Sequence, residues 1–310
     1  MLIDQFRSFH FTNYPNDMEM LIEHFSIFGG LGCEIDTSKT TQELIKIHIL
    51  ENYFLLNQKI EYLTLEDNSI KRLLAALAVG DRRMFSAFNR AGVSNAKGGA
   101  SLHYLEEKGL IWVEYSREKA KEKKPNQKLK KQEARRRISH KVFFVHPFVR
   151  FWFYFVHPHT REIQNRDYEN FFKRFANRQN SYTSLIFEEL SELLLDYHLR
   201  DTQIISTGSY WDANMEIDIL TITEDGSIYV GECKWTNSLV NKKLVNQIKD
   251  KCDKLEIEPT QIILFSKRGF SKELLQNQGK DLALYSAEDF EILLKTDSKY
   301  QPTPKFIDVF

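Results

Sequence analysis

The sequence feature that most restricts the fold is a pair of short apolar segments, residues 216–220 (EIDIL) and 231–235 (GECKW), on either side of a polar turn at residues 224–226. Apolar, β-branched segments around a glycine-containing turn are typical of a β-hairpin. Both faces of these segments are apolar over much of their length, which predicts a hairpin in the centre of a sheet. The sequence therefore predicts a buried hairpin with charged side chains at one end.

The expected register of this hairpin brings carboxylates together. If the turn centres on its middle residue, Asp218 lies opposite Glu232, and Glu216 lies opposite Lys234. Side chains alternate along a strand, so these four charges share one face, and Ile217 and Ile219 lie on the other. Burying unpaired carboxylates costs several kcal/mol for each ion, whereas Mg²⁺ is typically bound by one or two carboxylates and a substrate phosphate. We predict a Mg²⁺ site at Asp218 and Glu232, with Mn²⁺ as the alternative metal. The competing interpretation is a salt-bridge cluster in which Lys234 neutralises Glu216.

Length and composition indicate a folded chain of two or three domains. The chain has 310 residues, of which 42% are hydrophobic and 28% are charged. No apolar segment approaches the roughly 20 residues that cross a bilayer, and the first residues do not resemble a signal peptide. Three cysteines without a CxxC pair predict neither a disulfide framework nor a zinc site. We expect a cytoplasmic protein that has no membrane partner.

The zero net charge conceals a basic segment at residues 117–141, which contains twelve Lys and Arg against three Glu. Such segregation favours a surface that binds a polyanion, and a solvated loop is the alternative. The residues that we expect to contact DNA are Lys97, Lys128, Lys130, Lys131, Arg135, Arg136 and Arg137.

Apolar spacing before the basic segment predicts three helices and a strand. The helices are expected at residues 69–80, at residues 82–92 and after Ser94, and the strand at residues 111–115. The segment LHYLEEKGLI at residues 102–111 is typical of the end of a winged helix-turn-helix. The basic segment then falls at the wing, where Lys and Arg neutralise phosphates without reading sequence.

The predicted fold class is α+β and multidomain. We expect a helical region at residues 1–65, a winged helix-turn-helix with the basic insertion at residues 66–146, an aromatic helical connector at residues 147–180, and an α/β domain with a mixed sheet at residues 181–310.

The charged hairpin resembles a known nuclease signature. Asp218 followed by the ECK segment of Glu232 and Lys234 resembles the PD-(D/E)XK motif of the restriction-endonuclease-like superfamily. The resemblance is to the uncharacterised C-terminal domain of archaeal-type AAA+ ATPases, which a winged helix precedes, and it covers residues 69 to 310. It implies that Asp218 and Glu232 bind Mg²⁺ and that Lys234 assists the attacking water. A glutamate on the preceding helix often joins them. Glu188 matches this placement, with Glu189 as the alternative.

Some features depart from this resemblance. No proline precedes Asp218, and no GxxxxGK[ST] segment is present, so an ATP-driven role requires a separate ATPase. Gln247 resembles the accessory glutamine of recombination-type members, although Lys251 stands where a tyrosine is expected. Glu216 is a second accessory residue.

These patterns predict a Mg²⁺-dependent DNA endonuclease, a hydrolase that docks DNA through a winged helix. The alternative is a non-catalytic DNA-binding or partner-binding protein, such as a regulator or an ATPase-associated subunit, that retains a nuclease-like scaffold. Besides DNA, the expected partners are a separate ATPase or a second copy of this chain.

Overall fold

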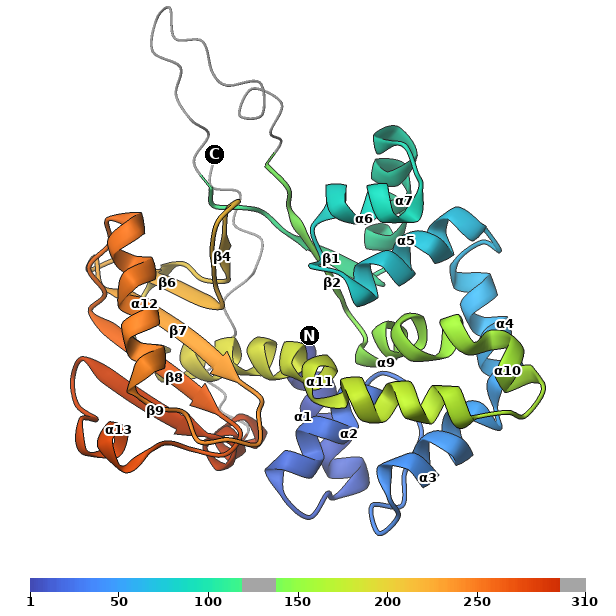
Figure 1. Cartoon of the computed structure of the whole chain (residues 1–310), viewed down its shortest axis with the longest axis horizontal. Coiled ribbons are helices and arrows are strands. Elements are labelled where there is room, and N and C mark those ends of the chain that lie inside the picture. Colours follow the sequence, from blue (N-terminus) through green and yellow to red (C-terminus); the bar gives the residue numbers. More distant parts are fainter. Residues whose placement is uncertain (119–137, 296–310) are drawn as a thin grey trace, which may run out of the picture.

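The structure is a computed structural model that describes residues 1–118 and 138–295 (Figure 1). It is an α+β structure in which helices surround one mixed five-stranded sheet. None of the helices in the described ranges is both long and apolar enough to span a membrane. Six of the predicted DNA contacts lie outside these ranges, namely Lys128, Lys130, Lys131, Arg135, Arg136 and Arg137.

The N-terminal region is helical, as predicted. Its elements are α1 (Leu2–Asn13), α2 (Met18–Phe28), α3 (Thr41–Ile45), the π-helical segment η1 (Lys46–Leu50) and α4 (Tyr53–Leu63). Asp17 caps α2 by accepting a hydrogen bond of 2.7 Å from the Met20 backbone N–H. Thr40 and Glu43 form a reciprocal capping box at the start of α3. Local side-chain chemistry therefore sets where these two helices begin.

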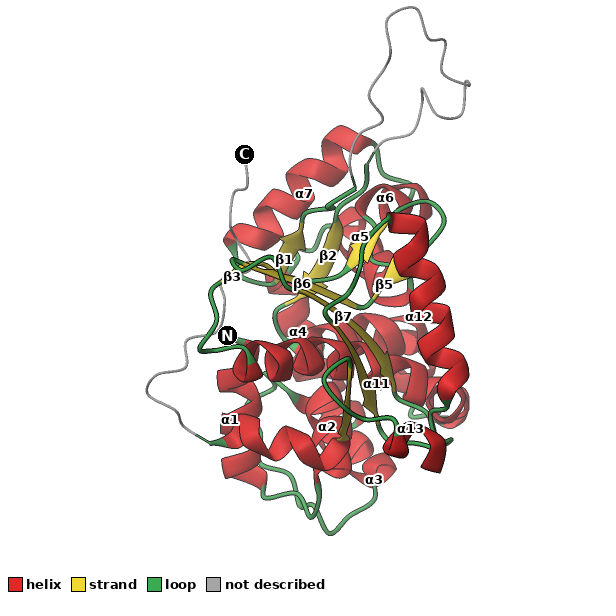
Figure 2. Ribbon diagram, turned by 90° about the vertical axis from the view of Figure 1, so that its left-hand side faces the viewer, coloured by secondary structure: helices red, strands yellow, loops and turns green. Residues whose placement is uncertain are grey.

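Three helices and a strand follow at the positions that the sequence predicts, and a second strand pairs antiparallel with the first. They are α5 (Asn68–Val79), α6 (Met84–Ala91), α7 (Asn95–Glu107), β1 (Ile111–Glu114) and β2 (Lys141–Phe144). Ser94 caps α7, and Gly92 ends α6 in the left-handed conformation. The basic segment connects β1 to β2. Figure 2 shows α6 and α7 at one end of the molecule and α1, α2 and α3 at the other.

An aromatic helix and a very long helix form the centre of the molecule. The elements are α9 (Pro147–Phe151), the π-helical η2 (Trp152–Val156), the 3₁₀ turn η3 (His157–His159), α10 (Thr160–Gln164) and α11 (Glu169–His198). Pro147 is the first residue of α9, as expected. Phe151 and Phe155 contact rings of α11 that include Phe175 and Tyr182. The boundary expected between residues 180 and 181 falls inside α11, which is one helix of 30 residues.

The C-terminal part contains the sheet. Its elements are β3 (Ile204–Ser206), β4 (Tyr210–Trp211), β5 (Glu216–Ile217), β6 (Ile219–Thr223), β7 (Ile228–Lys234), α12 (Lys242–Leu255), β8 (Gln261–Ser266), α13 (Lys272–Gln276), β9 (Leu282–Ser286) and the 3₁₀ helix η4 (Ala287–Leu294). The strand order is β3-β6-β7-β8-β9. β6 and β7 are antiparallel, and β7, β8 and β9 are parallel.

The sheet separates two apolar cores. Ile219, Cys233 and Phe265 face the large core that α11 and the N-terminal helices share. Val230 and Leu264 face the smaller core beneath α12, which lies across the sheet in Figure 1. Because β7 is the central strand and buried on both faces, the charged residues at its end are held in a fixed frame.

Candidate active site

The hairpin has the predicted register where its residues pair. Ile219 lies opposite Gly231, and Leu220 lies opposite Val230. β6 begins only at Ile219, and Asp218 occupies a bend before it. The Asp218 carboxylate Oδ2 accepts a hydrogen bond of 2.9 Å from the Cys233 backbone N–H. The Asp218 side chain therefore bonds to β7 at a position that lies beyond the end of the neighbouring strand β6.

The bend at Asp218 changes which face the preceding residues occupy. Ile217 packs in the core beneath α12, whereas Ile219 packs in the core beside α11. The prediction that both share a face is wrong, because the bend breaks the strict alternation of a strand. Glu216 pairs with Trp211 of β4 instead of continuing the hairpin. The expected pair of Glu216 with Lys234 is therefore absent.

Glu232 has two lysine partners at the end of β7. Lys234 Nζ lies 2.8 Å from Glu232 Oε1, and Lys251 Nζ from α12 lies 2.7 Å from Oε2. Glu232 is only 7% exposed. Lys234 therefore forms a salt bridge, as the competing interpretation predicted, but its partner is Glu232 and not Glu216. We call Asp218, Glu232, Lys234 and Lys251 the centre.

The other carboxylate of the centre lies in an excess of negative charge. Burial, followed by the charges of Glu188 and Glu232, raises the pKa of Asp218 to about 8, although the Cys233 N–H and Lys234 oppose the shift. Burial is also the main cause that raises the pKa of Glu188, and Arg82 opposes it. Glu188 of α11 therefore lies electrostatically close to Asp218.

Glu189, the alternative on α11, lies in a different environment. It is buried, and its charge acts on Arg150 and Tyr182 rather than on Asp218. Adjacent helix positions point about 100° apart, which explains why the two glutamates act on different neighbours.

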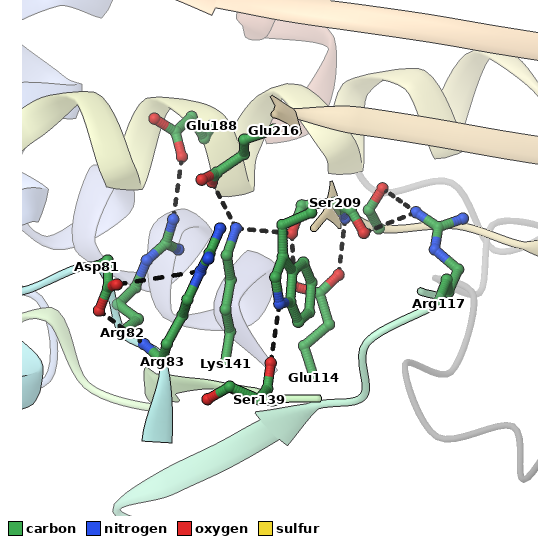
Figure 3. Close-up of polar contacts among 12 residues, drawn as sticks. Asp81, Arg82, Arg83, Glu114, Arg117, Ser139, Lys141, Glu188, Ser209 and Glu216 are labelled. Atoms are coloured by element: carbon green, nitrogen blue, oxygen red, sulfur yellow. Dashed lines mark hydrogen bonds and ion pairs between the residues drawn. The ribbon is translucent and has the colours of Figure 1, made fainter. Parts of the chain in front are cut away.

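A second ionic cluster lies beside the centre and joins the helical part of the chain to the sheet (Figure 3). We call it the latch. Lys141 of β2 is its core, with a fully buried side chain at 0% exposure. Its ammonium donates to Glu216 and, at 3.2 Å, to Ser209 Oγ, and lies 4.5 Å from the centre of the Trp211 ring. Burial raises the pKa of Glu216, but the Lys141 charge and hydrogen bond outweigh it, so the net pKa lies below the ordinary value.

Arg82 forms the second contact of the latch. Its backbone is left-handed, with φ of 63°, and its guanidinium lies 3.5 Å from Glu188. The guanidinium also lies 4.5 Å from the centre of the Phe143 ring. Figure 3 shows Arg82 and Lys141 directed from the same side toward Glu188 and Glu216.

The base of the basic segment forms the third contact of the latch. Arg117 donates to the backbone carbonyls of Leu220, Gly208 and Ser209 at 2.9, 2.6 and 2.9 Å. Glu114 accepts from the Ser209 backbone N–H at 2.7 Å and from its hydroxyl at 2.8 Å. Gly208 has φ of +132°, and a Cβ there would collide with the Glu114 carboxylate.

The remaining predicted residues lie at the periphery. Lys97 is exposed on α7, and its ammonium lies 3.4 Å from Asp67. Gln247 is exposed on α12, one helical turn before Lys251. Sequence reasoning did not assign a role to Lys251 or Lys141. For Lys251 the available signal was its spacing from Gln247, because residues four apart share a helix face.

The two carboxylates of the centre supply part of the ligand set that a hard cation needs. Within the described ranges, no group of three or more His, Cys, Asp and Glu side chains is arranged to hold a metal ion. Two carboxylates with phosphate oxygens are nevertheless a usual ligand set for Mg²⁺. Burial and the nearby Glu188 and Glu232 raise the pKa of Asp218, and a cation would stabilise its charged form. Glu232 would have to release at least one ammonium to bind it.

A middle segment of the chain matches a described family. Residues 152–248 match DUF234, archaeal and bacterial proteins of unknown function. Neither the curated proteins nor the solved structures contain a match to this chain. The matched residues include Asp218, Glu232 and Lys234, whereas Lys141 and Lys251 lie outside them.

Proposed function

We propose that this protein is a Mg²⁺-dependent DNA endonuclease of the restriction-endonuclease-like type. The observation that carries the proposal is the contact of Asp218 with the Cys233 backbone N–H. It fixes a carboxylate beside Glu232 and Lys234, at the end of a central strand. The resemblance of these three residues to the PD-(D/E)XK motif supports the same proposal.

In this proposal Asp218 and Glu232 hold the metal. When bound, Mg²⁺ polarises the scissile phosphate and lowers the pKa of a water molecule. The chain holds Asp218 rigidly through the N–H of Cys233, so the carboxylate does not need to reorganise. Glu188 adds negative charge to this side of the site.

Lys234 acts on the reacting phosphate. Its side chain is partly exposed, and its ammonium contacts Glu232 at 2.8 Å. Once the charge of Glu232 is shared with a cation, the ammonium becomes available to orient water or to contact the phosphate, whose negative charge grows in the transition state. An ammonium suits this role because it stays protonated: burial lowers its pKa, but the charges of Glu232 and Asp218 outweigh burial, so the net pKa lies above the ordinary value.

We further propose that α5, α6, α7 and the β1–β2 pair form a winged helix that docks DNA. The basic segment of residues 117–141 lies at the expected wing, between β1 and β2. Its Lys and Arg would bind phosphates and bring the duplex to the adjacent centre. The latch contacts of Arg117 and Lys141, at the two ends of this segment, support that placement.

A non-catalytic role is the second candidate, and one observation favours it. The carboxylates Glu188, Glu216 and Glu232 each contact a cation of the chain itself. Such pairing is what a structural ion network requires. In that case the nuclease-like part would be a scaffold for binding DNA or a protein partner.

A cleavage assay separates the two candidates. Purified protein is incubated with supercoiled, linear and branched DNA in Mg²⁺, in Mn²⁺ and in EDTA. We expect metal-dependent cleavage that falls by about 10³-fold or more in Asp218→Ala and about 10²-fold or more in Lys234→Met. Lys272→Met, which removes an exposed lysine from α13, is the matched control and should cut normally. Equal cleavage by Asp218→Ala and the control, or no cleavage by the unaltered chain, would reject the enzyme.

A further inference from the structure

The two carboxylates of the centre differ in charge balance. Asp218 accepts a hydrogen bond of 2.9 Å from a neutral group, the Cys233 backbone N–H. Glu232, in contrast, contacts two ammonium groups, one on each oxygen. Both lysines of the centre therefore lie on its Glu232 side.

The two lysines reach Glu232 from different elements. Lys234 lies two residues further along β7, whereas Lys251 comes from α12 and lies 2.7 Å from Oε2. A single ammonium is enough to neutralise a single carboxylate. The second one brings a further charge into a partly buried place and costs desolvation energy. The Lys251 side chain is 24% exposed, so its ammonium remains accessible to a ligand.

We propose that Lys251 is a positioning residue that holds Oε2 of Glu232 when no metal is bound and contacts a DNA phosphate when a metal is bound. The phosphate contact rests on the proposed nuclease function, but the competition for Glu232 does not. A divalent cation adds charge at Asp218 and Glu232, which weakens the attraction between Glu232 and a nearby ammonium. The displaced ammonium then lies next to the backbone of the bound nucleic acid, and a lysine binds phosphate as a point charge.

This proposal predicts opposite effects on two kinds of binding. In Lys251→Met, Oε2 loses its cation, so Mn²⁺ alone should bind about tenfold more tightly, the change that one pKa unit of interaction produces. The same variant loses one phosphate contact. The affinity for a duplex oligonucleotide in Ca²⁺ should therefore fall, and the slope of log K against log salt should shrink by about 0.9. A merely structural lysine would not move these two affinities in opposite directions.

The matched variants are Lys251→Arg and Lys249→Met. Arginine keeps the charge and should restore duplex binding to within about threefold of the unaltered chain. Lys249 lies on the same helix and is exposed, so its replacement removes an equal charge without touching Glu232. Mn²⁺ binding is measured by electron paramagnetic resonance without DNA, duplex binding by fluorescence anisotropy, and cleavage in Mg²⁺.

The outcomes separate this inference from the proposed function. If the unaltered chain cleaves DNA but Lys251→Met binds Mn²⁺ and duplex as Lys249→Met does, the role of Lys251 is overturned and the nuclease stands. If the unaltered chain cleaves nothing but Lys251→Met binds Mn²⁺ more tightly than Lys249→Met, the competition for Glu232 stands and the nuclease fails. Weaker Mn²⁺ binding by Lys251→Met would also overturn the inference, because the lysine would then be supporting the metal ligand.

Discussion

The latch and the centre are neighbouring ionic clusters that both contain lysine and glutamate, yet their charges are arranged differently. In the latch, Lys141 contacts Glu216 and Arg82 contacts Glu188, so each of these two cations has one acidic partner. In the centre, Glu232 contacts two ammonium groups, while neighbouring carboxylates help to raise the pKa of Asp218 to about 8. Each of these two latch carboxylates has its own cation, whereas both ammonium groups of the centre contact the same carboxylate.

This difference separates a structural role from a functional one. A buried ion pair with satisfied hydrogen bonds fixes how two parts of a fold meet. An unbalanced set of titratable groups at a strand end is more costly to keep, and such sets concentrate at functional sites. We therefore expect changes in the latch to act on stability and changes in the centre to act on ligand binding.

The strongest test of this contrast is to remove one lysine from each cluster. Lys141→Met leaves Glu216 without its ammonium, and we expect a loss of about 2–3 kcal/mol in the free energy of unfolding, below the value for a fully buried pair because the Glu216 side chain is 40% exposed. Lys234→Met should cost less than about 1 kcal/mol, because Lys251 still neutralises Glu232. Urea unfolding measures both values. Equal losses would erase the distinction between the two clusters.

Removing the basic segment should affect DNA binding and spare the latch. We propose replacing residues 119–137, which contain ten Lys and Arg, by a short Gly/Ser linker that keeps Arg117 and Lys141. The chain is close on both sides of the cut, since the Ser116 backbone N–H lies 3.1 Å from His140 Nδ1. Duplex affinity at low salt should fall about 100-fold and its salt dependence should flatten, because each lost phosphate contact removes about 0.9 from the slope.

The control for that experiment is stability. The urea midpoint of the shortened chain should stay close to that of the full chain, because the Arg117 and Lys141 contacts remain. Unchanged DNA binding would remove the wing from the proposed function, and a large drop in the midpoint would show that the segment also supports the latch.

The pH dependence of stability tests the charge imbalance of the centre directly. The pKa of Asp218 is about 8 in the folded chain, above the ordinary value of 3.8. The folded state therefore binds more protons than the unfolded state between these pH values, and stability falls as pH rises from about 4 to about 8. Asp218→Asn removes this loss, so the variant should match the unaltered chain at pH 4 and exceed it at pH 9.

We expect an advantage of about 1–2 kcal/mol at pH 9, less than the full shift implies, because Asp218 is partly exposed and solvent screens it. Thermal unfolding in EDTA at both pH values measures the difference. A constant difference between the two proteins across this pH range would contradict the raised pKa.

The smallest effect is expected at an exposed ion pair. Lys242 and Glu273 lie 3.1 Å apart, with side chains that are 59% and 57% exposed. Lys242→Ala should change the free energy of unfolding by less than about 1 kcal/mol, and added salt should abolish the effect. A loss as large as that of Lys141→Met would mean that burial does not account for the strength of the latch.

Much of the local structure was predictable from the sequence. Asp17, Thr40 and Ser94 start their helices where the capping pattern places them. The hairpin register follows from its turn as far as Ile219 and Gly231, and the charge of Glu232 acts on Asp218 just beyond them. The single helix α11 was not predicted, because the polar composition of residues 160–180 hides the aromatic stripe that packs on α9 and η2.

Two limits of pattern reading explain the remaining differences. The alternation of strand faces assumes a regular strand, and the bend at Asp218 violates it, which moved Ile217 to the other core and Glu216 to another partner. The spacing of residues in the sequence also reveals only contacts between residues that are close along the chain. Lys141 and Glu216 are 75 residues apart, and Lys251 and Glu232 are 19 apart across two elements.

The sequence by itself determined which carboxylates and which lysine lie at the hairpin, because strand pairing is a local property of the turn and the apolar pattern. Only the tertiary structure decided how their charges are balanced. The partner of each carboxylate comes from whichever distant element packs against it, and burial then sets how strongly the two interact. For that reason Lys141 holds Glu216 in the latch, and Lys234 and Lys251 share Glu232 in the centre.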